Sequence, residues 1–266
     1  MASPQIDASE IVETLETIRQ RGHSAHTVLG DWVNLMLYAL QRRDDPYLEI
    51  VDSYREERDI DHPDGQRSVD PFSKTFGQLQ EQMAETDTDV LGGIYEKYGM
   101  SSDASGQYFT PHNVCELMAE TAGITDEPDA DAEKKQTVAD PACGSGRMLL
   151  VAGRKLSDPL VVGQDKDPLC ARMAALNCCF LNLDSYIIHG DSLTIDFQRA
   201  WETSYSPMGG GVRELDEEEI SDLHEWVTDA FESTGEDGQE SESTAGSSKP
   251  PMTESVPAGQ VGLDAF

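Results

Sequence analysis

The stretch VADPACGSGRMLL, residues 138–150, constrains the fold more than any other part of the chain. An apolar run ends at Asp140, Gly144 and Gly146 flank a serine, and a second apolar run follows. This order predicts a buried strand, a tight turn and a helix that begins at the turn. Glycines let the backbone approach a ligand closely, and the first N–H groups of a helix are free to bind one. We therefore expect a small polar ligand over this turn.

Acidic residues at three strand ends narrow the choice of ligand. A phosphate-binding loop needs a lysine after its second glycine, and a dinucleotide loop needs a third glycine where Leu149 stands. Asp140 would repel a phosphate and attract an ammonium group. Asp165 ends the second apolar run, where an acid can bind a ribose diol. Asp191 ends the third run, where it or Ser192 can meet an adenine amine. S-adenosylmethionine carries all three groups.

Apolar runs and helical stripes alternate from residue 137 onward. This alternation predicts a parallel sheet with crossover helices, and the strand signal disappears after Asp191. The predicted elements are strands over 137–142, 160–164 and 185–189 and helices over 147–156 and 168–181. One amphipathic helix is expected later, with Ile220, Leu223, Val227 and Ala230 buried, and from Ser233 onward the composition predicts disorder.

The first hundred residues show helical periodicity and no strand pattern. Residues 9–58 carry three apolar stripes, of which the third includes Leu48, and residues 72–83 and 90–98 carry two more. Thr110 is expected to cap a further helix, with Pro111 in its first turn. In that helix we expect a buried stripe of Val114, Leu117 and Met118.

The formal net charge of −32, from 51 acidic and 19 basic residues, has two explanations. Thirteen acids and no Lys or Arg lie between Glu214 and Glu242, which suggests an acidic tail, yet the rest of the chain is also acidic. We therefore favour the surface of a salt-loving host, where carboxylates keep a protein hydrated. At about 1 M salt the Debye length is roughly 3 Å. The missing basic patch is then only weak evidence against DNA binding.

The cysteines and the hydropathy indicate a cytoplasmic protein. The five cysteines form no CxxC pair and no His cluster accompanies them, so we expect reduced thiols and no metal site. No apolar run is long enough for a membrane span, and the acidic N-terminus does not have the pattern of a secretory signal.

Four segments in order, LGGIYEKYG, GQYFTP, DPACGSGRML and GQDKDP…ARMAALNC…HGDSL, resemble the adenine-specific DNA methylase family, the methylase subunits of type I restriction-modification systems. The resemblance covers roughly residues 76–195. Together with the periodicity and composition it predicts an α/β fold: a helical N-terminal region (1–105), a partial class-I methyltransferase sheet that binds S-adenosylmethionine (106–200), and an acidic helix with a disordered tail (201–266).

The resemblance also implies roles by position. Gln107, Tyr108, Phe109, Thr110 and Pro111 would close over the methionine end of the cofactor, Asp140, Gly144, Ser145 and Gly146 would form the floor, Asp165 would bind the ribose and Asp191 the adenine. Plainer explanations stand beside these: a helix cap for Thr110, core packing for Tyr108 and Phe109, and a turn for Asp191. Asp167 is expected to cap the following helix, and Cys143 to be a small packed residue.

The family's catalytic element, Asn/Asp/Ser-Pro-Pro-aromatic, does not occur in this sequence. Ser206-Pro207-Met208 has one proline and no aromatic residue, so the catalytic residues are unknown. Three interpretations remain: a methylase component completed by another chain, a regulatory protein that keeps the cofactor fold, or a truncated product. The expected partners are DNA, reached through a complex, and a second methylase or specificity chain.

Overall fold

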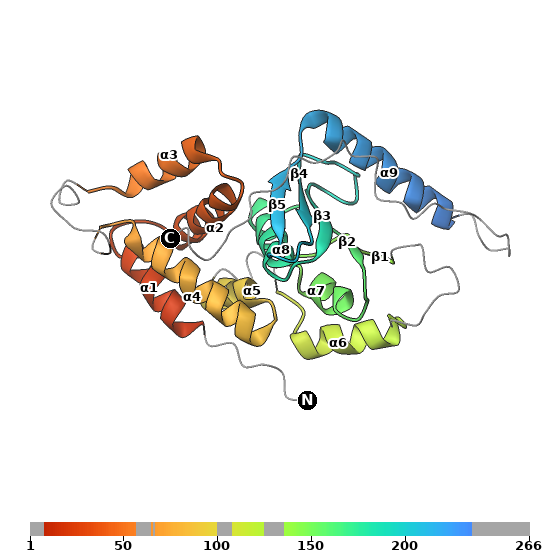
Figure 1. Ribbon diagram of the computed structural model, residues 1–266, viewed down its shortest axis with the longest axis horizontal. Helices are drawn as coiled ribbons and strands as arrows, with labels where there is room; N and C mark the ends of the chain where they lie inside the picture. The colour runs from red at the N-terminus through yellow and green to blue at the C-terminus, as the bar shows by residue number, and fades with distance from the viewer. Residues whose placement is uncertain (1–7, 57–64, 66, 100–107, 125–135, 236–266) are drawn as a thin grey trace.

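The computed structural model describes residues 8–56, 65, 67–99, 108–124 and 136–235 (Figure 1). Within this part of the chain the fold is α/β, as predicted, with helices first and a sheet after them. Disorder was predicted from Ser233 onward, but the last described helix continues to Gly235, so the prediction was wrong for its first three residues. The rest of that tail lies outside the described residues, and so does most of the loop predicted before residue 72.

Helices make up the described structure as far as residue 99 (left side of Figure 1). They are α1 (Ser9–Arg19), α2 (Ala25–Leu40), α3 (Asp44–Tyr54), α4 (Asp70–Thr86) and α5 (Val90–Lys97). Leu48 belongs to the third apolar stripe but is 47% exposed, because α3 packs on α2 through Val51 and Tyr54.

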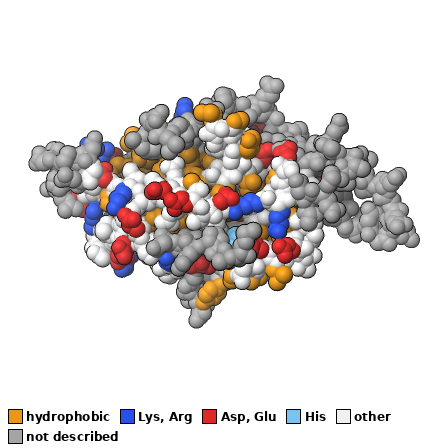
Figure 2. Space-filling view, turned by 60° about the horizontal axis from the view of Figure 1, so that its bottom comes forward, with side chains coloured by type: hydrophobic (Ala, Val, Ile, Leu, Met, Phe, Trp, Pro, Cys, Tyr) orange, Lys and Arg blue, Asp and Glu red, His pale blue; other side chains and the backbone are white. Residues whose placement is uncertain are grey.

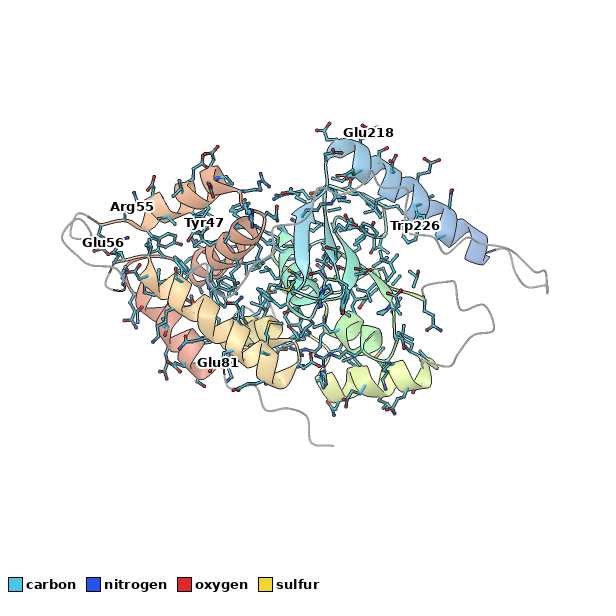
Figure 3. All side chains as sticks on the ribbon, viewed as in Figure 1. Tyr47, Arg55, Glu56, Glu81, Glu218 and Trp226 are labelled. Atoms are coloured by element: carbon cyan, nitrogen blue, oxygen red, sulfur yellow. The ribbon has the colours of Figure 1, made fainter. Side chains whose placement is uncertain are left out.

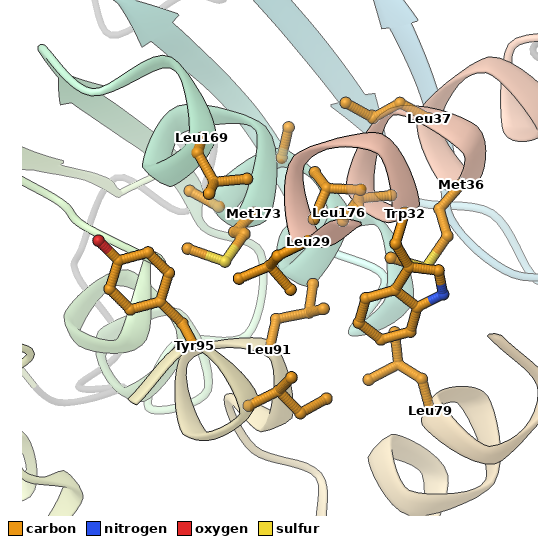
Figure 4. Packing of buried hydrophobic residues seen from close by; sticks show 14 of the residues in the cluster. Leu29, Trp32, Met36, Leu37, Leu79, Leu91, Tyr95, Leu169, Met173 and Leu176 are labelled. Carbon is orange, nitrogen blue, oxygen red and sulfur yellow. The ribbon is translucent and has the colours of Figure 1, made fainter. Parts of the chain in front are cut away.

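The helical region and the sheet share one hydrophobic core. Leu29 of α2 and Leu91 of α5 pack close to Leu176, which lies on α8 (Pro168–Phe180) beside the sheet (Figure 4). Trp32 is fully buried at the same place and its indole N–H donates to the carbonyl of Phe72 at 3.3 Å. Because the core is continuous, the helical region can fix the position of loops at the edge of the sheet.

The sheet has the order β1-β2-β3-β4-β5. Its strands are β1 (Thr137–Asp140), β2 (Leu160–Asp165), β3 (Asp184–His189), β4 (Arg199–Ser204) and β5 (Gly211–Glu214). The first three strands are parallel, joined by α7 (Arg147–Gly153) and α8, which confirms the predicted crossovers. β4 and β5 then pair antiparallel.

The expectation that no strand follows Asp191 was wrong. β4 buries polar side chains that hydropathy cannot identify as interior: the Thr203 hydroxyl lies 2.6 Å from that of Ser185, and Glu202 pairs with Arg213 at 2.6 Å. Since these polar groups have partners, their burial is not prohibitive. The resulting strand has no apolar alternation to reveal it.

Successive residues of the strands face opposite sides of the sheet. Val161, Ile187 and Trp201 join the core shared with the helical region. Their neighbours Leu160, Tyr186 and Ala200 pack instead against α9 (Glu217–Gly235), through Leu223 and Val227. In Figure 3, Trp226 points to the sheet side of α9 and Glu218 to the outside. Ala230 is exposed, contrary to prediction, because the described contacts of α9 with the sheet end at Val227.

Helix α6 (His112–Thr121) packs differently from its prediction. It begins after Pro111, and Thr110 does not cap it. Its buried residues are the small Cys115 and Ala119, which lie against Val151 of α7. The apolar stripe expected to be buried is exposed instead: Val114 by 38%, Leu117 by 62% and Met118 by 51%. Small side chains allow the closer approach of two helices, so contact formed on that face.

None of the helices in the described part of the chain combines the length and apolar character that a membrane crossing requires.

Candidate functional site

A cleft of about 610 Å³ opens at the carboxyl ends of β1, β2 and β3. Ligands of open α/β sheets bind at this edge, and the volume lies in the ordinary range of small-molecule sites. Predicted site residues that line it are Tyr108, Phe109, Thr110, Asp140, Gly144, Ser145, Asp165 and Asp191. Residues more than eighty positions apart in sequence therefore meet in one place.

Three predicted residues do not line the cleft or cannot be placed there. Gln107 lies outside the described residues. Pro111 stands at the start of α6, just beyond Thr110. Gly146 is the N-cap of α7 with φ of +85°, and a Cβ there would lie 3.2 Å from the side chain of Ala174. Its backbone conformation and the approach of α8 explain this glycine without a ligand.

The turn between β1 and α7 is fixed from two sides. Asp165 accepts a hydrogen bond from the Gly144 amide at 2.8 Å, which ties the turn to the end of β2. On the other side, a Cβ on Gly144, at φ of +55°, would lie 2.8 Å from the Phe109 ring. The Phe109 ring thus lies directly against Gly144, and the centre of the Tyr95 ring lies 5.1 Å from the centre of the Phe109 ring. The segment before α6 and the glycine turn form adjoining walls.

The strand-end carboxylates are held by backbone amides. Asp140 accepts from Ala142 at 3.0 Å, and Asp191 accepts from Leu193 at 2.9 Å. Asp165 accepts from Gly144 and from Asp167, both at 2.8 Å. A carboxylate offers about four lone-pair sites, so each acid keeps acceptor capacity after these bonds.

Burial sets the electrostatics of the cleft. It raises the pKa of Asp140 above its ordinary value, although the Ala142 amide opposes the shift. Burial likewise raises the pKa of Asp165, and the nearby charges of Asp167 and Asp140 add to it. Carboxylates in this state gain most from a ligand that brings positive charge or hydroxyl donors.

The interpretations of Asp167 and Cys143 are confirmed. The Asp167 carboxylate accepts from the amides of Leu169 and Cys170, which caps α8. Cys143 is 5% exposed, and burial raises the pKa of its thiol well above the ordinary value. All five cysteines are free and buried.

Several residues that line the cleft were not predicted from the sequence. Met118 and Met148 face it from α6 and α7, Arg147 and Lys166 bring positive charge, and Leu193 stands 93% exposed at its rim. Periodicity had placed Met118 in a buried stripe, so no pattern pointed to the cleft. Arg147 follows the second glycine directly, and that position was the only signal available for it.

Residues 86–206 match the sequence profile of the N-6 DNA Methylase family. The chain is similar to that family over this segment, 121 of its 266 residues. The matched range includes every residue that lines the cleft and the strands β1, β2, β3 and β4.

Curated relatives match over similar lengths. The chain is 32% identical over 142 residues to the type I restriction enzyme MjaVII methylase subunit of Methanocaldococcus jannaschii, covering 49% of this chain and 23% of that protein. The MjaVIII methylase subunit of the same organism is 34% identical over 120 residues, 41% of this chain and 19% of the relative. The type II restriction enzyme and methyltransferase RM.BcgI of Heyndrickxia coagulans is 34% identical over 77 residues, which cover 27% of this chain and 11% of that protein. The chain thus spans about a fifth of the length of the first two. No solved structure matches it significantly.

Proposed function

We propose that this chain binds S-adenosylmethionine and serves as the donor-holding part of an adenine-specific DNA methylase in a restriction-modification system. The observation that carries the proposal is the convergence of Asp140, Asp165 and Asp191 on one cleft with the Tyr108–Thr110 segment. The match of residues 86–206 to the N-6 DNA Methylase family supports it. The bound cofactor would supply the methyl group.

Each proposed role follows from the local chemistry. Asp140 would hold the ammonium group, because its buried carboxylate gains from a cation. Asp165 would accept from the ribose hydroxyls with the lone pairs left after its two amide bonds. Asp191 would meet the adenine amine. Phe109 and Gly144 would enclose the methionine end, where the glycine permits the close approach of the backbone.

Methyl transfer itself would require groups that these 266 residues do not supply. The sequence has no Pro-Pro-aromatic tetrad that could grip an extruded adenine, and extrusion costs a few kcal/mol that such contacts normally offset. Among the described residues β1 pairs only with β2, so its other edge could accept a strand of a second methylase chain. DNA and a specificity chain would be reached through the resulting complex.

A regulatory role is the second candidate, in which the chain keeps the cofactor fold and binds partners without catalysis. The uncovered Val114, Leu117 and Met118 of α6 favour an interaction surface near the cleft. The two candidates agree on cofactor binding and differ in whether a completed complex transfers methyl groups.

The proposed setting is the cytoplasm of a salt-loving host. All five cysteines are free, and the net charge is −32. Figure 2 shows carboxylates dispersed over the visible face among basic side chains, rather than gathered in one patch. Such a surface repels itself when unscreened, so we expect the melting temperature to rise from about 0.1 to about 3 M KCl. A flat or falling curve would contradict this setting.

Calorimetric titration with S-adenosylmethionine in molar KCl tests the cofactor. We expect binding by the wild type and a loss of about 1.5–3 kcal/mol in Asp140→Ala, which is roughly tenfold to over a hundredfold in affinity. Asp87→Ala is the matched control, because Asp87 is an exposed acid paired with Arg154 away from the cleft. Equal affinities in wild type and Asp140→Ala would sink the assignment of Asp140.

Transfer of labelled methyl groups to unmethylated DNA separates the candidate functions. We expect no labelling of adenine by this chain alone, because the donor is held but the target amine is not positioned. Addition of a polypeptide that carries the Pro-Pro-aromatic tetrad and pairs with β1 should restore labelling if the chain is a methylase component. Labelling by the isolated chain, lost in Asp140→Ala, would show that its catalytic residues were missed.

A further inference from the structure

Asp89 is a buried carboxylate to which the proposed function gives no role. It is 1% exposed, does not line the cleft and stands at the N-cap of α5, in the helical region. Its Oδ1 accepts from the Gly92 amide at 2.7 Å. A Cβ on Gly92 would lie 2.1 Å from Asp89 Oδ2, so a glycine is required there. Part of the LGGIYEKYG segment is therefore shaped around this carboxylate.

The remaining hydrogen bonds of Asp89 cross from the helical region to the sheet. Asn177 of α8 donates to Oδ1 at 2.7 Å, while Ser145 and Arg147 donate to Oδ2 at 2.6 and 2.8 Å. Asn177 also donates to the carbonyl of Ser145 at 2.8 Å. With the Gly92 amide, these bonds fill the acceptor capacity of the carboxylate. Ser145 itself lines the cleft.

Arg147 extends the network to the other wall of the cleft. Its Nη1 donates to the carbonyl of Thr110 at 3.1 Å, and its guanidinium lies 5.7 Å from the centre of the Phe109 ring. One carboxylate thus holds both the glycine turn and the Thr110 segment. Bonds to a buried charged group are strong and directional, so they fix the spacing of the two walls. Asp165 meets the same turn only at the Gly144 amide, and Asp191 accepts from Leu193; no described bond joins either acid to Asp89 or Arg147.

We propose that Asp89 is a positioning residue that sets the separation of the two walls around the methionine end of the cofactor, and that the helical region thereby controls cofactor affinity. The inference rests on the proposed function. It predicts a selective defect, because the network reaches the walls assigned to the amino-acid portion and not the acids assigned to the ribose and adenine.

Two probes read this selectivity by calorimetry on the full chain in molar KCl. S-adenosylhomocysteine has the amino-acid portion, and 5′-methylthioadenosine lacks it. We expect Asp89→Asn to weaken binding of S-adenosylhomocysteine about tenfold or more and binding of 5′-methylthioadenosine by about twofold at most. Arg147→Lys keeps the charge but loses the planar fork, so it should show the same selectivity to a smaller extent. Leu79→Ala, a fully buried packing change in the same region, is the control and should not discriminate between the probes.

The outcomes separate the two hypotheses. Equal weakening of both probes, or no change in either, in Asp89→Asn and Arg147→Lys would overturn the positioning role while leaving the proposed function intact. A wild type that binds neither probe would overturn the proposed function and this inference with it. If Asp89→Asn does not fold, Arg147→Lys decides alone, with faster amide hydrogen exchange at residues 144–147 of the ligand-free protein as the expected second readout.

Discussion

The two edges of the sheet differ in how they are covered. β5 contacts α2 and α8, and Glu214 at its end pairs with Arg43 at 2.5 Å and with Arg199 at 2.6 Å. β1, at the other edge, pairs with no described strand except β2, and its Ala139 side chain is exposed. Proteins usually cover or charge an open edge. Only the β5 edge has such cover in the described part of the chain.

The two edges also differ in how their charged side chains are paired. At the β5 end the charged groups satisfy one another: Arg213 pairs with Glu202 at 2.6 Å and with Glu219 at 2.7 Å. At the β1 end, Asp140 has one amide partner and a pKa that burial raises. Removing one partner of a buried ion pair destabilises a fold, whereas a carboxylate with free acceptor capacity can serve a ligand. The charged groups at the β5 end are therefore paired within the fold, whereas Asp140 keeps acceptor capacity for the proposed ligand.

The largest expected effect is the loss of stability when an ion pair at the β5 end is removed. Arg213→Ala leaves Glu202, which is only 5% exposed, without its cation. It should lower the free energy of unfolding by about 3 kcal/mol. This value is in the lower part of the range for buried pairs because Arg213 is a quarter exposed. Urea unfolding at constant KCl measures it. Arg55→Ala, an exposed pair with Asp52 (Figure 3), is the control and should cost under about 1 kcal/mol. Similar losses in both variants would contradict a stabilising role for the β5 end.

The next effect concerns the pH dependence of binding at the β1 end. Asp140 must be ionised to attract an ammonium group, and burial raises its pKa. Affinity for S-adenosylmethionine should therefore decline with falling pH from a higher pH than an ordinary aspartate would give, approaching the loss of about 1.5–3 kcal/mol expected for Asp140→Ala. Calorimetry across a pH series measures this. Asp140→Ala, already weakened, should show a flatter profile; a parallel profile would assign the titration to another group.

The smallest effect concerns the stability of the ligand-free protein. A raised pKa means that the folded state favours protonated Asp140, so that contribution to stability is present below the unfolded pKa and is lost as pH rises through the folded value. Asp140→Asn should then raise the free energy of unfolding at neutral pH by about 0.5 kcal/mol, after allowance for partial exposure, while it weakens binding. Thermal unfolding at two pH values measures it. Destabilisation at neutral pH would mean that the carboxylate supports the fold.

Local patterns in the sequence determined the elements that are regular and apolar. The helices over 9–54 and 70–97 and the three parallel strands follow from period and from the glycine turn, because burial of an apolar face requires that spacing. The positions of Asp140 and Asp165 at strand ends followed for the same reason. Neighbouring parallel strands then bring such residues to one edge of a sheet.

Only the tertiary structure decided which face of a helix is used and which polar groups are paired. Val114, Leu117 and Met118 form a good apolar stripe, yet α6 packs through Cys115 and Ala119. Strand β4 could not be predicted from hydropathy, because Glu202 and Thr203 are buried with polar partners on the neighbouring strands. Asp89 and Arg147, 58 positions apart, could not be paired from spacing alone. Hydropathy records the cost of burying each residue by itself, whereas these outcomes depend on contacts between residues distant in sequence.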